Sequence, residues 1–530
     1  GKADTFWVRH FTPADKMPPN AADIHSGVCT NRIYTDIAKS PNASGQEGSF
    51  GIVGTPVIDK ASNTLYFVFR CRDLSVDNSF HQFDVDYPSS GFYQYFHAID
   101  LSTGGNKFGP PVLIDPATTI TPGTGRGNNN GIISFDPRRE NQRGGLALSN
   151  GIVYIPYAAH CDWDNYYGWV LGYLASDPTQ QVIRYVTAPN SERGGIWMSG
   201  AGPAVDSSGN LFFAVGNGGS NTNASDPGNM SLSIVKAAYD QTNHTLTNIA
   251  AFQPTSYSTW NGSDLDFGTG VVLIPGSNMA VTAHKAGKIY VINQNANSGK
   301  YNENSASFLG SYELAGGGSH SSLTYFGGAT AKWLYQFSEY TNVTAFQVNT
   351  ASGTLGTKIT NTSVPTNTGL LGGFMSVSSN GTDDNSGILW VTHFTPSGGA
   401  LHALKASNIA QELWNSDANS IDRLGDYAKM NCVTIWNGKV YAPTFTNTLN
   451  VYGLLANNSR CVNNIAQNKT PIFSSEDPVN KGIKALDGDN NSFWSVSNTT
   501  QDSYFEVDLG GRFDICKIRI NWNSLADYAK

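Results

Sequence analysis

The residues best suited to chemistry fall in a few short tracts. The densest is Arg138-Arg139-Glu140-Asn141-Gln142-Arg143. Its cationic side chains could recognise an anion, although a solvated loop with internal ion pairs explains the run better. A second tract, His160-Cys161-Asp162, places a histidine, a thiol and a carboxyl side by side. Because successive side chains of a strand point to opposite faces, these groups cannot form a nucleophilic triad directly. We therefore expect a structural histidine and a buried or disulfide-bonded cysteine.

Two further histidines, His284 and His320, stand next to predicted turns. Either could reach a central site, but a hydrogen bond within the turn is the simpler expectation. The run Gly316-Gly317-Gly318 is not a phosphate-binding loop, because no Lys-Ser/Thr pair follows it and no helix is predicted there.

The cysteines show no CxxC or Cys/His spacing typical of a zinc site. Six cysteines in a chain rich in Asn and Thr favour disulfides and an oxidising compartment. Their positions favour a Cys29–Cys71 pair in the first loop-rich region and a Cys432–Cys461 pair across a domain junction, with the other pairings left open.

Asn-x-Ser/Thr sequons are frequent, although a chain this rich in Asn, Ser and Thr makes many by chance. In a eukaryotic source several should carry glycans on surface loops of a secreted protein. The candidate acceptors are Asn42, Asn223, Asn229, Asn243, Asn261, Asn342, Asn361, Asn380, Asn457, Asn468, Asn490 and Asn498.

Composition narrows the class of protein further. The chain has 530 residues, 14% of them charged, and a formal net charge of −8. It contains no basic stripe, so we expect no nucleic-acid partner. No apolar run reaches about 18 residues, so we expect no membrane span. The sequence starts inside the pattern of strands and turns and shows no signal peptide, which is typical of a processed or partial chain.

The elements that must position these tracts are short strands in a repeating unit. The clearest copy of a strand-turn phrase is Ala98–Gly104, and weaker copies start at Ala345 and Ala403. Strand-only repeats with a period of roughly 40–60 residues predict a β-propeller. Seven units are expected, at 51–113, 144–187, 197–254, 267–312, 321–360, 372–415 and 430–455.

The last unit contains only three predicted strands, Cys432–Trp436, Lys439–Pro443 and Leu449–Gly453. A blade normally has four, and the N-terminal strand Phe6–Phe11 could supply the fourth and close the ring. The long segments 12–50 and 114–143 are expected to fold over one face of the ring.

The composition changes after Leu455, which predicts a propeller over 1–456 and a second domain over 457–530. The Asp487-Gly488 turn, Trp494-Ser495 and the strand Tyr504–Gly510 resemble the first half of a discoidin domain, a β-sandwich of the jelly-roll type. The resemblance implies a Ca²⁺ site with Asp487 and Ser492 as ligands and backbone carbonyls around Asn490; a plain polar turn is the alternative. No sugar ligand is assigned to this domain, because Phe493 and Trp494 look like core residues.

The first 455 residues resemble the pyrroloquinoline-quinone-like propellers of secreted repeat proteins. The matching tracts include Gly54–Asp59, Phe135–Arg143, Gly168–Tyr173, Gly194–Gly200 and Asp266–Gly270. The resemblance implies one more blade upstream of Phe6, and so an eight-bladed parent; seven blades is the self-contained alternative.

Quinone-dependent dehydrogenases need a Ca²⁺ site of carboxylate and amide oxygens, an Asp base, an Arg and a flat ring under the quinone. Residues that could fill these roles are Arg138, Arg139, Glu140, Trp197, Asp264 and Asp266. A simpler interpretation is that Asp266 stabilises a turn and that Trp197 packs between neighbouring blades. We therefore expect no pyrroloquinoline quinone and no catalytic residues.

The primary hypothesis is a secreted, non-catalytic scaffold or adhesive protein that binds glycans, extracellular matrix or sister subunits, with an extracellular filament as one form of assembly. The alternative is a secreted quinoprotein dehydrogenase, anchored to polysaccharide by its discoidin-like domain.

Overall fold

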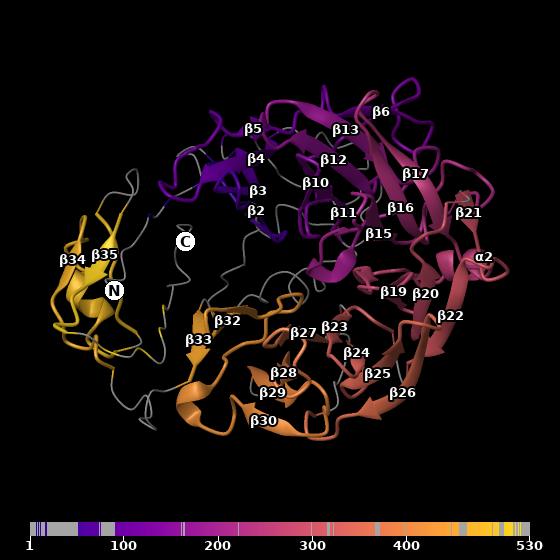
Figure 1. Ribbon diagram of the computed structural model, residues 1–530. Coiled ribbons are helices and arrows are strands. Elements are labelled where there is room, and N and C mark those ends of the chain that lie inside the picture. The colour runs from indigo at the N-terminus through magenta and orange to yellow at the C-terminus, as the bar shows by residue number, and fades with distance from the viewer. Residues whose placement is uncertain are drawn as a thin grey trace.

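Seven β-sheets follow one another around a ring (Figure 1). The all-β fold with seven propeller blades that the repeats predict is therefore confirmed. The computed structural model describes residues 51–73, 91–160, 165–220, 222–297, 299–314, 318–321, 323–365, 372–396, 398–446, 448–454, 464–489, 491–497 and 503–511, and a few positions between and outside these ranges, including 7, 9, 11, 16–18, 75 and 162.

The first three blades are antiparallel sheets in chain order. Blade 1 also pairs with the short strand β1 (Lys16–Met17), and blade 3 gains a parallel edge strand, β21 (Gly299–Tyr301). Their strands are β2 (Val57–Asp59), β3 (Thr64–Asp73), β4 (Phe92–Asp100) and β5 (Val112–Leu113); β9 (Ala147–Ser149), β10 (Ile152–Pro156), β12 (Trp169–Leu174) and β13 (Gln181–Val186); and β14 (Ala204–Val205), β15 (Leu211–Val215), β16 (Ser233–Asp240) and β17 (Thr245–Phe252).

Blades 4 to 6 have four strands each, whereas blade 7 has three among the described residues. Their strands are β18 (Val272–Leu273), β19 (Met279–His284), β20 (Lys288–Asn293) and β22 (Phe308–Glu313); β23 (Thr324–Gly327), β24 (Lys332–Gln336), β25 (Thr344–Asn349) and β26 (Thr354–Thr360); β27 (Gly373–Ser378), β28 (Ile388–Thr395), β29 (Gly398–Lys405) and β30 (Glu412–Asn415); and β31 (Thr434–Trp436), β32 (Lys439–Pro443) and β33 (Leu449–Gly453).

Strand alternation gives every blade two apolar faces. In β3, Tyr66 and Val68 pack against blade 2, while Phe67 and Phe69 point to the opposite face. The same arrangement repeats around the ring, with one apolar cluster between each pair of neighbouring blades from 1–2 to 6–7. These inter-blade clusters are the core, and they fix the position of each blade's inner end.

The free face of blade 1 is covered by N-terminal residues. The ring of Phe11 lies 4.9 Å from Phe67 and 5.3 Å from His97. Trp7 Nε1 donates to the carbonyl of Leu101 at 2.7 Å. The three described residues of the predicted Phe6–Phe11 strand, at positions 7, 9 and 11, lie outside any strand. The described contacts of Trp7 and Phe11 are with blade 1. Pairing of the N-terminal segment with blade 7 stays a prediction.

Short paired strands lie outside the blades. The pair β6 (Ile120–Pro122) and β7 (Ile132–Ser134) falls in the predicted long loop 114–143, and β8 (Glu140–Asn141) pairs with β11 (Ala158–Ala159). Beyond the propeller, β34 (Pro471–Phe473) pairs with β35 (Phe505–Val507).

The β34–β35 pair has a small aromatic core. The ring of Trp494 lies 5.0 Å from that of Phe505, and its Nε1 donates to the carbonyl of Ser475, so this partly buried residue packs in the small cluster. The domain limits 1–456 and 457–530 and the discoidin resemblance stay predictions. In the described part of the chain, no helix has the length and apolar character needed to cross a membrane.

Candidate functional site

The run from Arg138 to Gln142 is buried, so the expectation of a solvated loop was wrong. None of these five side chains is more than 5% exposed. An internal ion pair is present, because Arg139 Nε lies 3.4 Å from an Asp136 carboxylate oxygen. The side chain of Arg70 in β3 reaches across and donates to the carbonyls of this turn. The run therefore ties blade 1 to blade 2.

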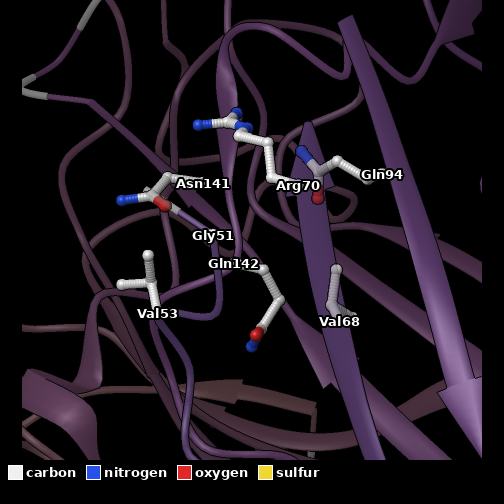
Figure 2. Close-up of a pocket in the computed structure, with 7 residues that line it drawn as sticks. All are labelled: Gly51, Val53, Val68, Arg70, Gln94, Asn141 and Gln142. Carbon is white, nitrogen blue, oxygen red and sulfur yellow. The ribbon is translucent and has the colours of Figure 1, made fainter. Parts of the chain in front are cut away.

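A small cavity lies beside this tie (Figure 2). Its volume is about 10 Å³, which is room for about one water molecule. Four buried polar atoms of its lining residues have no hydrogen-bond partner among the described residues: Nε of Arg70, Oε1 of Gln94, Nδ2 of Asn141 and Oε1 of Gln142. The cavity is lined by Gly51, Val53, Val68, Arg70, Gln94, Asn141 and Gln142. It is polar, but far too small for an organic ligand.

The richest convergence of chemically useful side chains lies where blades 2, 3 and 4 meet near the ring axis. Each residue lies in a segment that leads into an innermost strand, or in the connection between a blade's second and third strands. In an up-and-down blade these two kinds of connection share one end, so the side chains gather on one face of the ring. We call this set the central site: Asp162, Tyr166, Trp197, Asp264, Asp266 and Lys285.

Lys285 stands between two carboxylates of its own blade. Its Nζ lies 3.0 Å from an Asp266 oxygen and 3.2 Å from an Asp264 oxygen. The side chains run from interior to rim, with Asp266 2%, Lys285 16% and Asp264 50% exposed. Burial alone would lower the pKa of Lys285, but Asp266 and Asp264 raise it above its usual value. Lys285 therefore stays an ammonium ion and is unsuited to act as a nucleophile.

Asp162 faces this group from blade 2. The hydroxyl of Tyr166 donates to its Oδ1 at 2.6 Å. Burial raises the pKa of Asp162, and the negative charges of Asp266 and Asp264 raise it further, against the opposing effect of Lys285. The Asp162 carboxyl therefore holds a proton more readily than an exposed aspartic acid does.

Trp197 provides the aromatic surface of the central site. Its ring lies 5.9 Å from that of Tyr166 in an edge-to-face arrangement, and the guanidinium of Arg143 lies 5.2 Å from its centroid. Its Nε1 is buried and has no hydrogen-bond partner among the described residues. That nitrogen and Oδ2 of Asp266 both lie within 3.0 Å of the position that a Cβ would take on Gly216. Glycine at 216 thus leaves room for an indole donor and a carboxylate acceptor to lie close together.

Several residues in or next to the central site have a left-handed backbone. Asp162 (φ 52°), Met198 (48°), Ser199 (48°), Asp264 (53°) and Met430 (65°) all have left-handed conformations. Such conformations cost energy for residues other than glycine and cluster at binding and catalytic sites. This signal points to a functional site, and the sequence alone does not reveal it.

Segments from distant blades close the ring axis beside Trp197. Arg143, before blade 2, contacts the sulfur of Met430, before blade 7. The carbonyl of Met430 lies 2.5 Å from the position that a Cβ would take on Gly200. The segments before blades 2, 3 and 7 therefore meet beside Trp197.

The two histidines near turns have different partners. Nδ1 of His284 accepts a hydrogen bond from the backbone of Ala286 at 2.9 Å, so the expected turn hydrogen bond is confirmed. His320 instead binds the buried carboxylate of Glu339 through Nδ1. His160 is buried against Arg70, as expected for a structural histidine, and Cys161 lies outside the described residues.

The predicted Ca²⁺ turn is partly described. The hydroxyl of Ser492 lies 2.8 and 2.7 Å from the two carboxylate oxygens of Asp487. The structure therefore brings these two predicted ligands together, whereas Asn490 lies outside the described residues. The Ca²⁺ site stays a prediction.

Sequons differ in exposure. Asn223, Asn243, Asn380 and Asn468 are exposed, and Asn261 and Asn342 are partly exposed. The amides of Asn229 and Asn361 are buried and donate to Asn223 and Ile409 carbonyls, which leaves no room for a glycan. We correct these two candidates. The remaining ones, Asn42, Asn457, Asn490 and Asn498, lie outside the described residues.

The predicted disulfides are not resolved by the described residues. Cys71 is buried in β3, and its predicted partner Cys29 lies outside them. Cys432 is a free thiol in the described part of the chain, and Cys461 lies outside it. Both pairings stay predictions.

The fold and the site define this chain as a seven-bladed β-propeller with a polar central site. No protein-family model matches the sequence, and no curated protein matches it. The chain is similar to a Dos1 propeller (10% identity over 77% of this chain and 84% of that one, TM-score 0.41). It is also similar to dihydro-heme d1 dehydrogenase NirN in complex with DHE (12% identity over 76% of this chain and 64% of that one, TM-score 0.40). A third similar structure is a quinohemoprotein alcohol dehydrogenase from Comamonas testosteroni (13% identity over 76% of this chain and 70% of that one, TM-score 0.37). Likeness at these identities concerns the fold alone, and none of these comparisons supports a discoidin domain.

The central site does not fit a quinone with its Ca²⁺ ion. The three carboxylates that could bind a divalent cation already surround or face the Lys285 ammonium. Among the described residues, no group of three or more His, Cys, Asp or Glu side chains is arranged to hold a metal ion. One face of Trp197 is covered by Arg143. We therefore derive no redox step at this site.

Proposed function

We propose that this protein is a non-catalytic binding propeller that takes up a glycan at the central site. The observation that carries the proposal is the pairing of an indole donor without a partner with a carboxylate acceptor across Gly216. A sugar hydroxyl both accepts and donates a hydrogen bond, so one hydroxyl could bind Trp197 and Asp266 together. A carboxylate and an ammonium at the rim, from Asp264 and Lys285, supply further partners for neighbouring hydroxyls.

We also propose that the protein binds this glycan outside the cell. The sequons on exposed loops and the composition of the chain support a secreted protein that acts as an extracellular scaffold or adhesive component. Matrix, sister subunits and a filament remain alternative partners, and each would use surfaces other than the central site.

The test is calorimetric titration with a panel of neutral oligosaccharides, using Trp197→Phe as the main variant. Phenylalanine keeps an aromatic ring but lacks the N–H donor, so binding should weaken by about threefold to tenfold. The matched control is Trp436→Phe, because Trp436 is 69% exposed on blade 7, and it should bind as the wild type does. If no oligosaccharide binds, or if both variants bind as the wild type does, the proposal fails.

The alternative, a quinoprotein dehydrogenase, would use the same Trp197 and Asp266. Its test is addition of pyrroloquinoline quinone with Ca²⁺, followed by difference absorbance and dye-linked alcohol oxidation. We expect no saturable binding, because Lys285 already pairs with two of the carboxylates that an ion would need and Arg143 covers one face of Trp197. Saturable binding that Trp197→Phe weakens would favour the dehydrogenase instead.

A further inference from the structure

We propose that the small cavity between blade 1 and the Arg138–Gln142 run is a binding site for a single water molecule, which completes the junction with blade 2. The proposal is independent of the glycan site. It is carried by the match between the size of the cavity and the hydrogen-bonding groups on its walls (Figure 2).

The polar walls of the cavity come from two separate parts of the chain. Arg70 in β3 and Gln94 in β4 are directly paired across the sheet of blade 1, so their side chains lie on the same face. Asn141 and Gln142 belong to the run that precedes blade 2. None of the four side chains is more than 5% exposed. The cavity is therefore enclosed by side chains that the fold holds in place.

Each of these four residues has one buried polar atom without a partner among the described residues. In Arg70 both terminal nitrogens are engaged, which leaves the Nε–H. The Nε2 groups of Gln94 and Gln142 donate to main-chain carbonyls, so the Oε1 atom of each amide is an acceptor without a donor. Buried polar groups are nearly always hydrogen-bonded. Four such atoms on residues around one cavity therefore indicate a shared partner.

Water is the ligand whose chemistry fits these atoms. They comprise two donors, on Arg70 and Asn141, and two acceptors, on Gln94 and Gln142. A water molecule accepts two hydrogen bonds and donates two, so it complements this set. An anion would face the two amide oxygens, and a cation would face N–H groups and the charge of Arg70. The volume of about 10 Å³ also limits the ligand to about one water molecule.

The experiment is a high-resolution crystal structure of the whole chain, with further crystals soaked in bromide or in rubidium. We expect one density peak in the cavity, within hydrogen-bond distance of at least three of the four atoms, and no anomalous signal after either soak. A cavity without density, or one filled by a side chain of the protein itself, would overturn the proposal. A bromide or rubidium peak would also overturn it, because the site would then bind an ion.

A stability measurement tests the same proposal in solution. Val68 lines the cavity and is 3% exposed, so the added methylene of Val68→Ile should expel the water and leave the four polar atoms unpaired. Val281→Ile is the matched control, because Val281 lies in the second strand of blade 4, is fully buried against the next blade and does not line the cavity. Val68→Ile should melt about 2 °C or more below this control. If it melts at or above the control, the methylene fills a space that holds no bound water, and the proposal fails.

Discussion

Replacing Arg70 with methionine should destabilise the propeller measurably. Arg70 lies in β3 and is 4% exposed. Its Nη2 lies 2.9, 3.0 and 2.6 Å from the carbonyl oxygens of Pro137, Arg138 and Glu140, and its Nη1 contacts His160. This side chain therefore ties blade 1 to the turn that precedes blade 2 and leads to Arg143.

The expected loss follows from these contacts. A hydrogen bond to a charged group contributes about 1.5–3 kcal/mol, and the three carbonyls share the two hydrogens of Nη2, so these bonds together contribute about 3–6 kcal/mol. Part of this is offset by the cost of the buried charge. Burial lowers the pKa of Arg70 to about 10, a shift equivalent to about 3 kcal/mol. Gln94 also donates to the Pro137 and Glu140 carbonyls, which limits the damage. We expect a net loss of about 1–3 kcal/mol.

The assay is thermal unfolding followed by circular dichroism, with guanidinium unfolding as a second measure. Arg184→Met is the matched control, because Arg184 is exposed and binds only Gln181 through Nε among the bonds described. Arg70→Lys should be nearly as harmful as Arg70→Met, since one ammonium cannot replace a planar guanidinium fork. If Arg70→Met melts like the control, or if Arg70→Lys melts like the wild type, the reasoning is refuted.

Three other outcomes can be measured on the same protein. Burial lowers the pKa of three histidines to about 3, so the folded chain binds fewer protons than the unfolded chain below about pH 6.5. The free energy of unfolding should therefore fall as the pH drops from about 6.5 towards 3. A melting temperature that is unchanged between about pH 7 and about pH 5 would contradict this. These histidines are His97, His284 and His393. Expression in a eukaryotic secretory host should give glycans at the four exposed sequons but none at Asn229 or Asn361, which glycopeptide mass spectrometry would show. Phe11→Ala should cost about 2 kcal/mol of stability, because its ring packs on Phe67; the exposed Phe394→Ala is the control, and equal melting of the two would show that the N-terminal contact is weak.

The fold was predictable because it depends on local patterns. Each predicted unit contains one observed sheet, and the three strands expected near the end of the ring match β31, β32 and β33. Alternating apolar residues fix which side chains face each neighbouring blade, and Gly/Asn turns fix where the strands end. These signals lie within about ten residues of one another, so a single sequence contains them.

The central site was only partly predictable, because its geometry depends on contacts between distant segments. Asp264, Asp266 and Trp197 were candidates, but their partners Asp162, Tyr166 and Lys285 were not grouped with them. The buried state of the Arg138–Gln142 run was missed for the same reason, since its burial depends on Arg70 in another blade. Left-handed backbone at Met198 and Ser199 leaves no trace in residue type, because neither residue favours that conformation.

The choice between a binder and a cofactor enzyme depends on which cation the carboxylates of the central site hold. A divalent ion needs several oxygen ligands at short distances and cannot share them with an ammonium that already lies 3.0 and 3.2 Å from two of the carboxylates. Lys285 is held there by the same charges that raise its pKa, so removing it from the site would leave three carboxylates without a counter-ion. A ligand that brings hydroxyls leaves the Lys285 ion pairs in place. The arrangement therefore favours a site that recognises a polar ligand over one that is built around a metal-bound cofactor.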